Sequence, residues 1–386
     1  MHYAEFLNGL VRCLYQYMNI NKKTSLKIII YSEISWNFLE QRHHHLADYF
    51  AKRNYEVHFV QRVVSRVPSL KELLQVFIKL IFGSKNNSVE KKVPSNVTLR
   101  RSLFLPVALP LSGLYNWLIW FIFERKYQKK AIIYSFVNNH FLIGGNFPVR
   151  AQHALSIFDI IHNWWEFPWH KKLHRTLVSR NIRAYDKIVT DSPAIAKKLN
   201  CMEIPHHTML PGVGLEWLNT ASSSGEVAPV FFGNLRSNSD VELIERVSEM
   251  YSTELLGLID SSINGSIENA SYLGEFNSAD LVKQISKYNL ILLPYDDGEF
   301  SKTIAPAKYF EALATGSLVV TRAEMNHLPG FDDYVIKLND LSKASLDGLQ
   351  EALVKQQYNR ESQIEFAKQH LWEKRFSNLL EFLEVN

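Results

Sequence analysis

Short β-branched runs alternate with longer amphipathic stretches along most of the chain, and this alternation restricts the possible folds more than any other feature. It is typical of parallel α/β domains, in which each helix returns the chain to the start of the next strand. A chain of 386 residues is too long for one ordinary hydrophobic core. The sequence therefore predicts an α/β protein with two parallel-sheet domains.

A small, polar stretch from Asn219 to Val227 interrupts the alternation and is predicted to be a linker. It sets the expected domains at residues 1–218 and 219–362, followed by the tail 363–386. The strands expected in the two domains are Lys27–Tyr31, Glu56–Val60, Ala131–Ser135, Leu155–Ile161, Lys187–Thr190, Pro229–Gly233, Thr253–Ile259, Asn289–Pro294 and Ser317–Thr321. Near the end of the chain, separate amphipathic helices are expected at Lys343–Gln356 and Gln363–Phe382.

Charge is distributed unevenly between the two halves. Residues 1–218 hold 29 Lys and Arg against 14 Asp and Glu, a net +15, and residues 219–386 hold 14 against 25, a net −11; the sum is the +4 of the whole chain. This asymmetry indicates an anionic surface or ligand facing the first half, although drift of charge between domains produces the same pattern.

Cys13 and Cys201 are the two cysteines, too few for a disulfide framework, and neither lies in a Cys/His cluster with metal-ligand spacing. The stretch Met1–Asn21 places Glu5 and Arg12 inside its apolar part, which is unlike a secretory signal. Both observations favour a cytoplasmic location.

The stretch from Leu103 to Phe123 has no charged residue over 21 positions, which is long enough for a helix that spans a membrane. Pro106, Pro110 and Gly113 argue against one straight span. The segment is therefore expected to be buried in the first domain or to lie on a membrane surface. Its basic flanks make contact with an anionic membrane a second expectation.

The stretch from Tyr295 to Gly316 has the pattern of an anion site. A buried strand ends at Pro294, a polar loop follows, and a helix begins near Pro306 and ends at Gly316, a natural C-cap. Ligands of an open parallel sheet bind beyond the carboxyl ends of its strands. A helix N-terminus at that edge suits a diphosphate.

Lys308 and Glu311 are three residues apart on this helix and share one polar stripe. Lys308 is suited to pair with phosphate, and Glu311 is suited to accept hydrogen bonds from two ribose hydroxyls. An ordinary amphipathic helix with a surface Lys–Glu pair has the same spacing, so the pattern by itself leaves both interpretations open.

Residues 308–320, K-Y-F-E-A-L-A-T-G-S-L-V-V, resemble the K-x-x-E-Y-L-A-A-G-x-P-V-V segment of GT-B glycosyltransferases of the group-1 (family 4-like) class. Within that class the chain looks most like enzymes of bacterial capsule, teichuronic acid and exopolysaccharide assembly. Five further segments match in order, and they begin at Trp36, Tyr185, Leu210, Val230 and Trp372. The resemblance implies two Rossmann-like domains facing across a cleft, with a C-terminal helix that crosses back to the first domain.

The resemblance also implies a donor site for a nucleoside-diphosphate sugar, with Glu311 on the ribose and the loop before Pro306 on the diphosphate. The residues expected to bind the donor are Gly233, Arg236, Pro294, Tyr295, Thr303, Ile304, Ala305, Lys308 and Glu311. Thr303 stands where the retaining enzymes carry a first Glu, so the anomeric outcome stays open. Arg236 lacks the Lys that usually accompanies it, and Lys308 is the expected replacement.

On the acceptor side, His162 matches an Asp of the resembling enzymes that is a candidate general base, and a neutral imidazole suits this role. Glu166 is the carboxylate alternative, and a role for His162 in binding donor hydroxyls is a third interpretation. Trp36, Arg42 and Trp165 are expected to contact the acceptor, although a Trp-rich core is an equally good interpretation of the tryptophans. No metal site is expected, because His43, His44 and His45 diverge around a helix.

Together these features predict a hexosyltransferase-type enzyme that moves a sugar from a nucleotide-sugar donor to a saccharide or lipid-linked saccharide in surface polysaccharide synthesis. Neither a cofactor nor a nucleic-acid partner is expected. The enzyme is expected to lie at the periphery of the cell membrane, on its inner face. The alternatives are a catalytically silent GT-B partner subunit and a sugar-nucleotide epimerase on the same fold.

Overall fold

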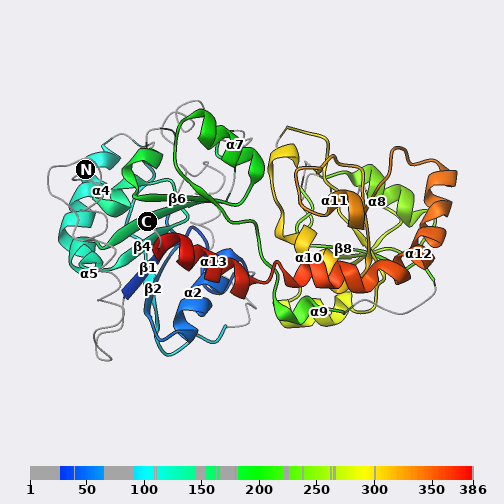
Figure 1. Ribbon diagram of the computed structural model, residues 1–386, viewed down its shortest axis with the longest axis horizontal. Coiled ribbons are helices and arrows are strands. Elements are labelled where there is room, and N and C mark those ends of the chain that lie inside the picture. The colour runs from blue at the N-terminus through cyan, green and yellow to red at the C-terminus, as the bar shows by residue number, and fades with distance from the viewer. Residues whose placement is uncertain are drawn as a thin grey trace, which may run out of the picture. The chain divides into compact units, whose positions relative to one another are not determined.

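The computed structural model describes residues 27–38, 40–64, 91–107, 109, 111–144, 153–161, 163–165, 179, 181–220, 226–236, 239–260, 263, 267–299 and 301–384. The chain forms two compact units. The first unit comprises Met1–Thr190, Lys198–Thr208 and Asn378–Asn386, and the second comprises Asp191–Lys197 and Met209–Ser377. Each unit contains one parallel sheet with helices packed on it (Figure 1).

The sheet of the first unit has seven strands in the order β3-β2-β1-β4-β5-β6-β7, and all its pairs are parallel. Its strands are β1 (Lys27–Tyr31), β2 (Glu56–Gln61), β3 (Val97–Arg101), β4 (Ile132–Ser135), β5 (Leu155–Ile160), β6 (Lys187–Thr190) and β7 (His207–Thr208). Ile28, Ile29 and Ile30 are all fully buried. A central parallel strand is covered on both faces, which explains its unbroken apolar run.

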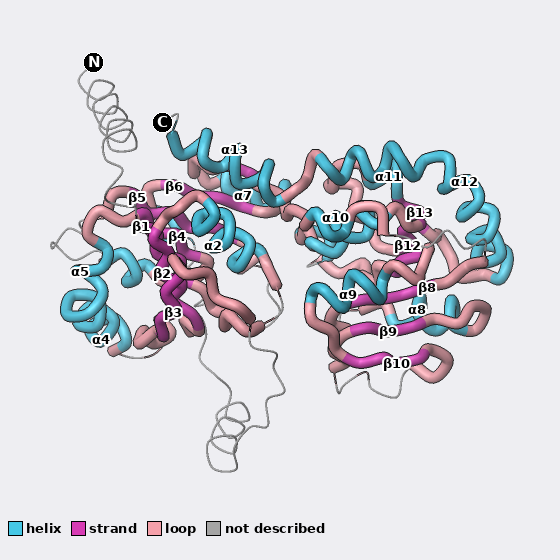
Figure 2. The backbone as a smooth tube through the Cα atoms, turned by 90° about the horizontal axis from the view of Figure 1, so that it is seen from below, coloured by secondary structure: helices cyan, strands magenta, loops and turns pink. Residues whose placement is uncertain are grey.

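The sheet of the second unit has six strands in the order β10-β9-β8-β11-β12-β13, again all parallel (Figure 2). Its strands are β8 (Pro229–Phe232), β9 (Glu254–Leu256), β10 (Ser271–Gly274), β11 (Leu290–Leu292), β12 (Leu318–Thr321) and β13 (Val335–Lys337). Val230 and Phe232 join one core cluster and Phe231 joins another, because successive side chains of β8 point to opposite faces.

Helices cover both faces of the second sheet. Leu313 of α10 (Ala307–Thr315) belongs to one core cluster, and Leu243 of α8 (Val241–Ser248) belongs to the other. The remaining helices of the two units are α2 (Arg42–Lys52), α4 (Ser112–Ile119), α5 (Arg125–Gln128), α7 (Pro193–Cys201), α9 (Ser278–Ile285), α11 (Phe331–Tyr334), α12 (Lys343–Lys368) and α13 (Trp372–Glu384). The predicted α/β fold with two Rossmann-like domains is confirmed.

The prediction for the end of the chain was wrong in its helix boundaries. Helix α12 continues without a break from Lys343 to Lys368, so no new helix begins at Gln363. The interruption lies instead between α12 and α13, where Val213 exchanges backbone hydrogen bonds with His370 (3.0 Å) and Trp372 (3.1 Å). This long-range pairing sets the break, and local sequence carries no sign of it. Past the break, in the first unit, Phe382 of α13 stacks on His207.

The apolar stretch after Leu103 is helical in its second half. Helix α4 continues into a π-helical turn, Trp120–Glu124, and then into α5. Among the described residues, no helix has the length and apolar content needed to cross a membrane.

Candidate functional site

Helix α10 is held in the second unit by its buried apolar face and by the cap at its C-terminal end. Its apolar side chains Tyr309, Phe310 and Leu313 are fully buried in a core cluster. Gly316 adopts the left-handed conformation (φ 76°) expected of a C-cap residue. The Gln363 side-chain amide donates to the Leu313 and Ser317 carbonyls at 3.0 Å each, which gives backbone carbonyls at the C-terminal end of the helix a hydrogen-bond donor. At the other end Pro306 is the N-cap residue and makes no side-chain cap hydrogen bond.

Lys308 of this helix lies directly over Gly233, the residue that follows β8. A Cβ placed on Gly233 would lie 1.8 Å from Cε of Lys308. Gly233 also has a φ of 114°, a backbone conformation that side chains with a Cβ rarely adopt. The glycine is therefore required twice, for its own backbone and for the close approach of the lysine. The contact brings Gly233 and Lys308, which are 75 positions apart in the sequence, next to each other.

Four predicted donor residues influence one another electrostatically. Partial burial lowers the pKa of the Lys308 ammonium; the Glu311 carboxylate opposes this shift and the Arg236 guanidinium adds to it. Burial raises the pKa of the Tyr295 hydroxyl, and the charge of Glu311 raises it further while Arg236 lowers it. Two cations, one carboxylate and one phenol therefore meet where β8 and β11 end, at the edge where parallel sheets bind ligands.

The loop between β11 and α10 is held by its own hydrogen bonds. Tyr295 pairs with Ser239 in an isolated bridge, which ties this loop to the one that carries Arg236. The Pro294 carbonyl accepts the Asp240 N–H at 2.9 Å. Asp296 accepts hydrogen bonds from the Ser301 hydroxyl and, at 3.2 Å, from the Gly298 N–H, as in a turn.

The last residues of this loop lie next to the helix N-terminus. Thr303 ends a short 3-10 turn, Ser301–Thr303, and its carbonyl accepts the Ser192 hydroxyl. The Ile304 carbonyl lies 2.8 Å from Nε2 of His327. Ala305 is 5% exposed and belongs to the core. The loop is thus a fixed part of the second unit.

Two residues of this region were not predicted from the sequence. Asn234 follows Gly233, and its side-chain Oδ1 is buried without a hydrogen-bond partner among the described residues. Gly257 follows β9 with a φ of 129°, and a Cβ there would lie 2.0 Å from the Gly233 carbonyl oxygen. For Gly257 the available signal was a glycine directly after a buried strand, and for Asn234 it was an amide residue one position after such a glycine.

The residues predicted to bind the acceptor lie in the interior of the first unit. Trp36 is 4% exposed and contacts His44 and Phe59 edge-on, with centroid distances of 5.4 Å and 5.2 Å. Trp165 is buried; its indole N–H donates to the Ser179 hydroxyl at 3.1 Å, and the Lys198 ammonium lies 4.7 Å from its ring centroid.

Arg42 begins α2 and is buried against the end of β5. Its guanidinium lies 2.8 Å from the Asp159 carboxylate, which also accepts the Tyr134 hydroxyl at 2.6 Å. Burial raises the pKa of Asp159, and the positive charge of Arg42 opposes that shift. Asp159 precedes the segment that carries the predicted bases. His162 and Glu166 themselves lie outside the described residues.

Metal ligation has no support in the described part of the chain, where no three His, Cys, Asp or Glu side chains are grouped closely enough to hold an ion. The residues expected to bind the donor offer a different chemistry. Lys308 and Arg236 carry positive charge, which suits phosphate oxygens, and Glu311 carries a carboxylate, which suits vicinal hydroxyls.

Solved structures similar to this chain match it over almost its full length. One is a glycosyltransferase from Rickettsia africae ESF-5, with a TM-score of 0.56, 12% identity, and coverage of 93% of this chain and 97% of that one. Another is Arabidopsis thaliana UGT89C1, solved with UDP-L-rhamnose (TM-score 0.50, 10% identity, 93% and 98% covered) and with quercetin (0.51, 12%, 92% and 98%). No family model and no curated protein sequence matches.

These likenesses establish the class of fold. The chain has the GT-B fold, the two-domain architecture of these glycosyltransferases. Its sequence has diverged to 10–12% identity from them, so the assignment of the reaction depends on the chemistry of the site itself.

Proposed function

We propose that this chain is a glycosyltransferase that uses a nucleoside-diphosphate sugar. The observation that carries the proposal is the meeting of Lys308, Glu311 and Arg236 beside the Gly233 backbone, at the carboxyl ends of β8 and β11. A nucleoside-diphosphate sugar carries two charged phosphates and a ribose with vicinal hydroxyls. The side chains of the site match both parts of this ligand.

Each group has a definite task in the proposed reaction. Lys308 and Arg236 bind the diphosphate, and Glu311 accepts hydrogen bonds from the two ribose hydroxyls. Tyr295, Thr303 and the backbone before α10 complete the site, with Pro294, Ile304 and Ala305 shaping the loop. Charge-assisted hydrogen bonds of this kind contribute about 1.5–3 kcal/mol each.

In the transfer step the bond between the sugar C1 and the diphosphate oxygen breaks, and an acceptor oxygen forms a new bond to C1. The diphosphate leaves with the bonding electrons, so the cations of the site stabilise charge that grows in the transition state. The acceptor hydroxyl loses its proton to His162 or to Glu166, which we propose as the two candidate bases. Trp36, Arg42 and Trp165 are proposed to position the acceptor from the first unit.

The acceptor is proposed to be a saccharide or a lipid-linked saccharide, and the pathway to be capsule or exopolysaccharide synthesis by an enzyme of the group-1 class. The support is the ordered set of sequence matches and the basic first half of the chain. In this proposal the enzyme works in the cytoplasm, as a peripheral protein on the inner face of the membrane. UGT89C1, solved with UDP-L-rhamnose and with quercetin, is an example of this fold holding each kind of ligand.

The test combines binding and turnover on the purified full-length chain. A panel of nucleoside diphosphates is screened by thermal unfolding; a nucleotide at about 100 times its Kd stabilises the folded state by about 2.7 kcal/mol. Hydrolysis of the matching sugar nucleotide is then followed for the wild type, for Glu311→Ala and for Glu361→Ala, an exposed glutamate of α12 that serves as the control.

Glu311→Ala is expected to weaken nucleotide binding by about two to four orders of magnitude, since two charge-assisted hydrogen bonds of about 1.5–3 kcal/mol each are lost, while Glu361→Ala behaves as the wild type. Protection without any hydrolysis or transfer would identify a silent partner subunit, and conversion of the donor into a different sugar nucleotide would identify an epimerase. If no nucleotide protects the chain, the donor site is refuted.

A further inference from the structure

The helical segment from Leu111 to Lys130 exposes an unusual amount of apolar surface. Leu111 is 85% exposed, Leu114 58% and Ile122 56%. Together with their exposed apolar neighbours on the same segment we call them the docking face: Leu111, Leu114, Tyr115, Leu118, Phe121, Ile122 and Phe123. The nearby Leu103 and Leu105, 51% and 37% exposed, add to this surface. Contiguous apolar patches on a folded protein mark interaction sites.

The spacing of the docking face follows the helix. Leu111, Leu114, Tyr115 and Leu118 recur at intervals of three and four residues, which places them on one side. The π-helical turn at Trp120–Glu124 then presents Phe121, Ile122 and Phe123 in succession. Its wider turn accommodates one extra residue, so the apolar face is broadest at this point.

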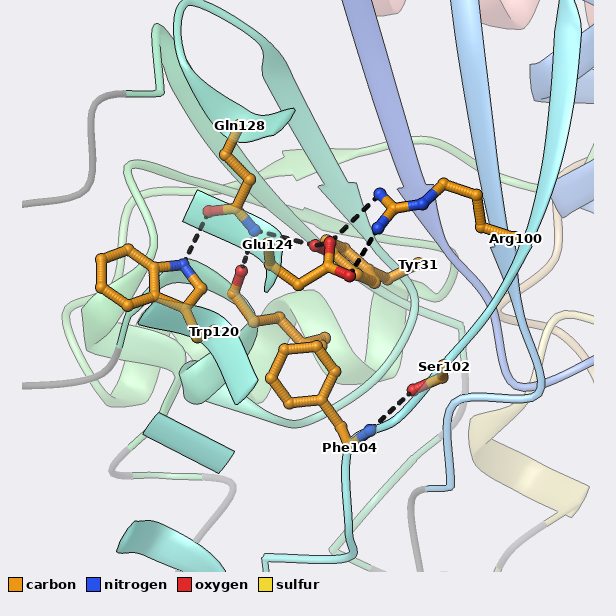
Figure 3. Close-up of polar contacts among 8 residues, drawn as sticks. Tyr31, Arg100, Ser102, Phe104, Trp120, Glu124 and Gln128 are labelled. Carbon is orange, nitrogen blue, oxygen red and sulfur yellow. Dashed lines mark hydrogen bonds and ion pairs between the residues drawn. The ribbon is translucent and has the colours of Figure 1, made fainter. Parts of the chain in front are cut away.

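The opposite side of the helix is fastened to the sheet by a buried polar network (Figure 3). Arg100 donates to both oxygens of Glu124 at 2.7 Å and 3.2 Å, and the Tyr31 hydroxyl donates to Glu124 at 3.0 Å. Gln128 donates to the Tyr31 oxygen and accepts the Trp120 indole N–H, both at 2.8 Å.

This network decides which side of the helix faces outward. Trp120, Glu124 and Gln128 are all buried; Glu124 and Gln128 bond to residues of β1 and β3, and Trp120 joins the network through Gln128. Removing a group from a buried ionic network leaves its partner unsatisfied, so the network holds the helix in one rotation. The exposed apolar residues are therefore presented by a fixed helix.

Positive charge adjoins the docking face. Arg125, Lys126, Lys129 and Lys130 follow it directly, and the Arg125 guanidinium lies 5.4 Å from the Phe121 ring centroid. Between Val97 and Ala131 the one acidic residue is Glu124, and it is buried and paired with Arg100. The surface around the docking face thus has no acidic residue from this part of the chain.

We infer that the docking face binds the surface of an anionic lipid bilayer, with α4 and the π-helical turn lying in the plane of the interface. The apolar side chains enter the boundary of the acyl chains, and the basic residues contact lipid phosphates. A second copy of this chain fits less well, because a two-fold contact would bring the two basic clusters together. This inference rests on the peripheral location proposed above and names the surface that provides it.

The test is flotation of the full-length chain with vesicles of phosphatidylcholine containing about one third phosphatidylglycerol. The variant Leu118→Ser/Ile122→Ser removes apolar surface, and Val354→Ser, at a half-exposed position of α12, is the control. We expect the double variant to bind at least about tenfold more weakly and the control to bind as the wild type. Lys126→Gln/Lys129→Gln is expected to weaken binding about fivefold per lysine at low salt.

Fluorescence supplies a second readout at one position. Trp117 of α4 lies beside Phe121, with stacked rings 5.4 Å apart, so lipids brominated near the glycerol are expected to quench it. Trp117→Phe should remove that part of the quenching. Hydrolysis of the donor in solution should be unchanged in every variant, which separates failure of this inference from failure of the glycosyltransferase proposal.

Two outcomes would overturn the inference. The first is vesicle binding that the apolar double variant leaves unchanged. The second is a concentration-dependent dimer that Leu118→Ser/Ile122→Ser dissociates, with no flotation at any salt concentration; that result would make the docking face an interface between copies of the chain.

Discussion

Replacing Gly233 by alanine perturbs the proposed donor site at its most crowded point. The new Cβ would meet Cε of Lys308 at 1.8 Å, so the lysine side chain must swing away from its position. The φ of 114° adds backbone strain, which costs about 1–3 kcal/mol of stability. Displacement of the ammonium removes one charge-assisted contact with phosphate, about 1.5–3 kcal/mol, and so raises the Kd of a nucleoside diphosphate about tenfold to a hundredfold.

A double-mutant cycle with Lys308→Ala isolates the contact between the two residues. Nucleotide binding is measured by titration calorimetry for the wild type, both single variants and the double variant. In the Lys308→Ala background the alanine at 233 no longer displaces an ammonium, so it should weaken binding little further. The expected coupling is therefore large, in contrast to the additivity of independent sites.

Gly274→Ala is the matched control, because Gly274 has a φ of 91° and no atom within 4 Å of an added Cβ. It carries comparable backbone strain without displacing a neighbour, so it should lower stability and leave nucleotide affinity unchanged. The reasoning is refuted if the losses at Gly233 and Lys308 are additive, or if Gly274→Ala weakens binding as much as Gly233→Ala does.

Two further predictions concern the stability of the first unit. Arg42→Met should cost about 3–5 kcal/mol in urea unfolding at pH 7, because it leaves the buried Asp159 carboxylate without its cationic partner; adding Asp159→Asn should recover much of that loss, and no recovery would mean that the ion pair is not the cause. Burial, with a smaller effect of Lys91, lowers the pKa of His44 to about 4 from 6.5. Below pH 6.5 the unfolded chain therefore binds a proton that the folded chain does not, and stability should fall by about 3 kcal/mol in total as the pH drops to 4. In unfolding measured at pH 7 and pH 5, His44→Gln should reduce the difference between the two values; an unchanged difference would assign the acid sensitivity to other groups.

The strands that the sequence predicted and those that it missed differ in their position within the sheets. The nine predicted strands match central strands, and β1 and β6 have the predicted bounds. The four missed strands, β3, β7, β10 and β13, are the four edges of the two sheets. An edge strand is covered less and carries polar residues, as the exposed Ser271 and Tyr272 of β10 do. Edge strands therefore lack the continuous apolar run on which the prediction depended.

The candidate site was predictable only where it depends on local spacing. The helix at Lys308 and Glu311 and its cap at Gly316 follow from residues within one turn of each other. The contact of Lys308 with Gly233 depends on the packing of α10 beside β8, which no local pattern encodes. The same holds for Arg42: its position at the start of a helix was readable, but its ion pair with Asp159 required the register of α2 against β5.

The acidic surplus of the second half is compatible with binding an anionic donor because, in the part of the chain that the structure describes, the two cations of the proposed site are not used in ion pairs as other basic residues of the unit are. Several basic side chains of the second unit are held in ion pairs with its acidic residues: Arg246 with Glu249, Lys302 with Glu299, Arg322 with Asp240 and Glu242, Lys337 with Glu324, and Lys368 with Glu365. Within the described residues, Arg236 and Lys308 form no ion pair as short as these, whose N–O distances are 2.6 to 3.3 Å. Charges farther apart than about 8 Å are largely screened at physiological salt, so a ligand at the site responds to these two cations far more than to the net charge. Binding of a nucleoside diphosphate should therefore weaken as salt rises, and binding that strengthens with salt would show that repulsion by the net negative charge of the unit governs the interaction.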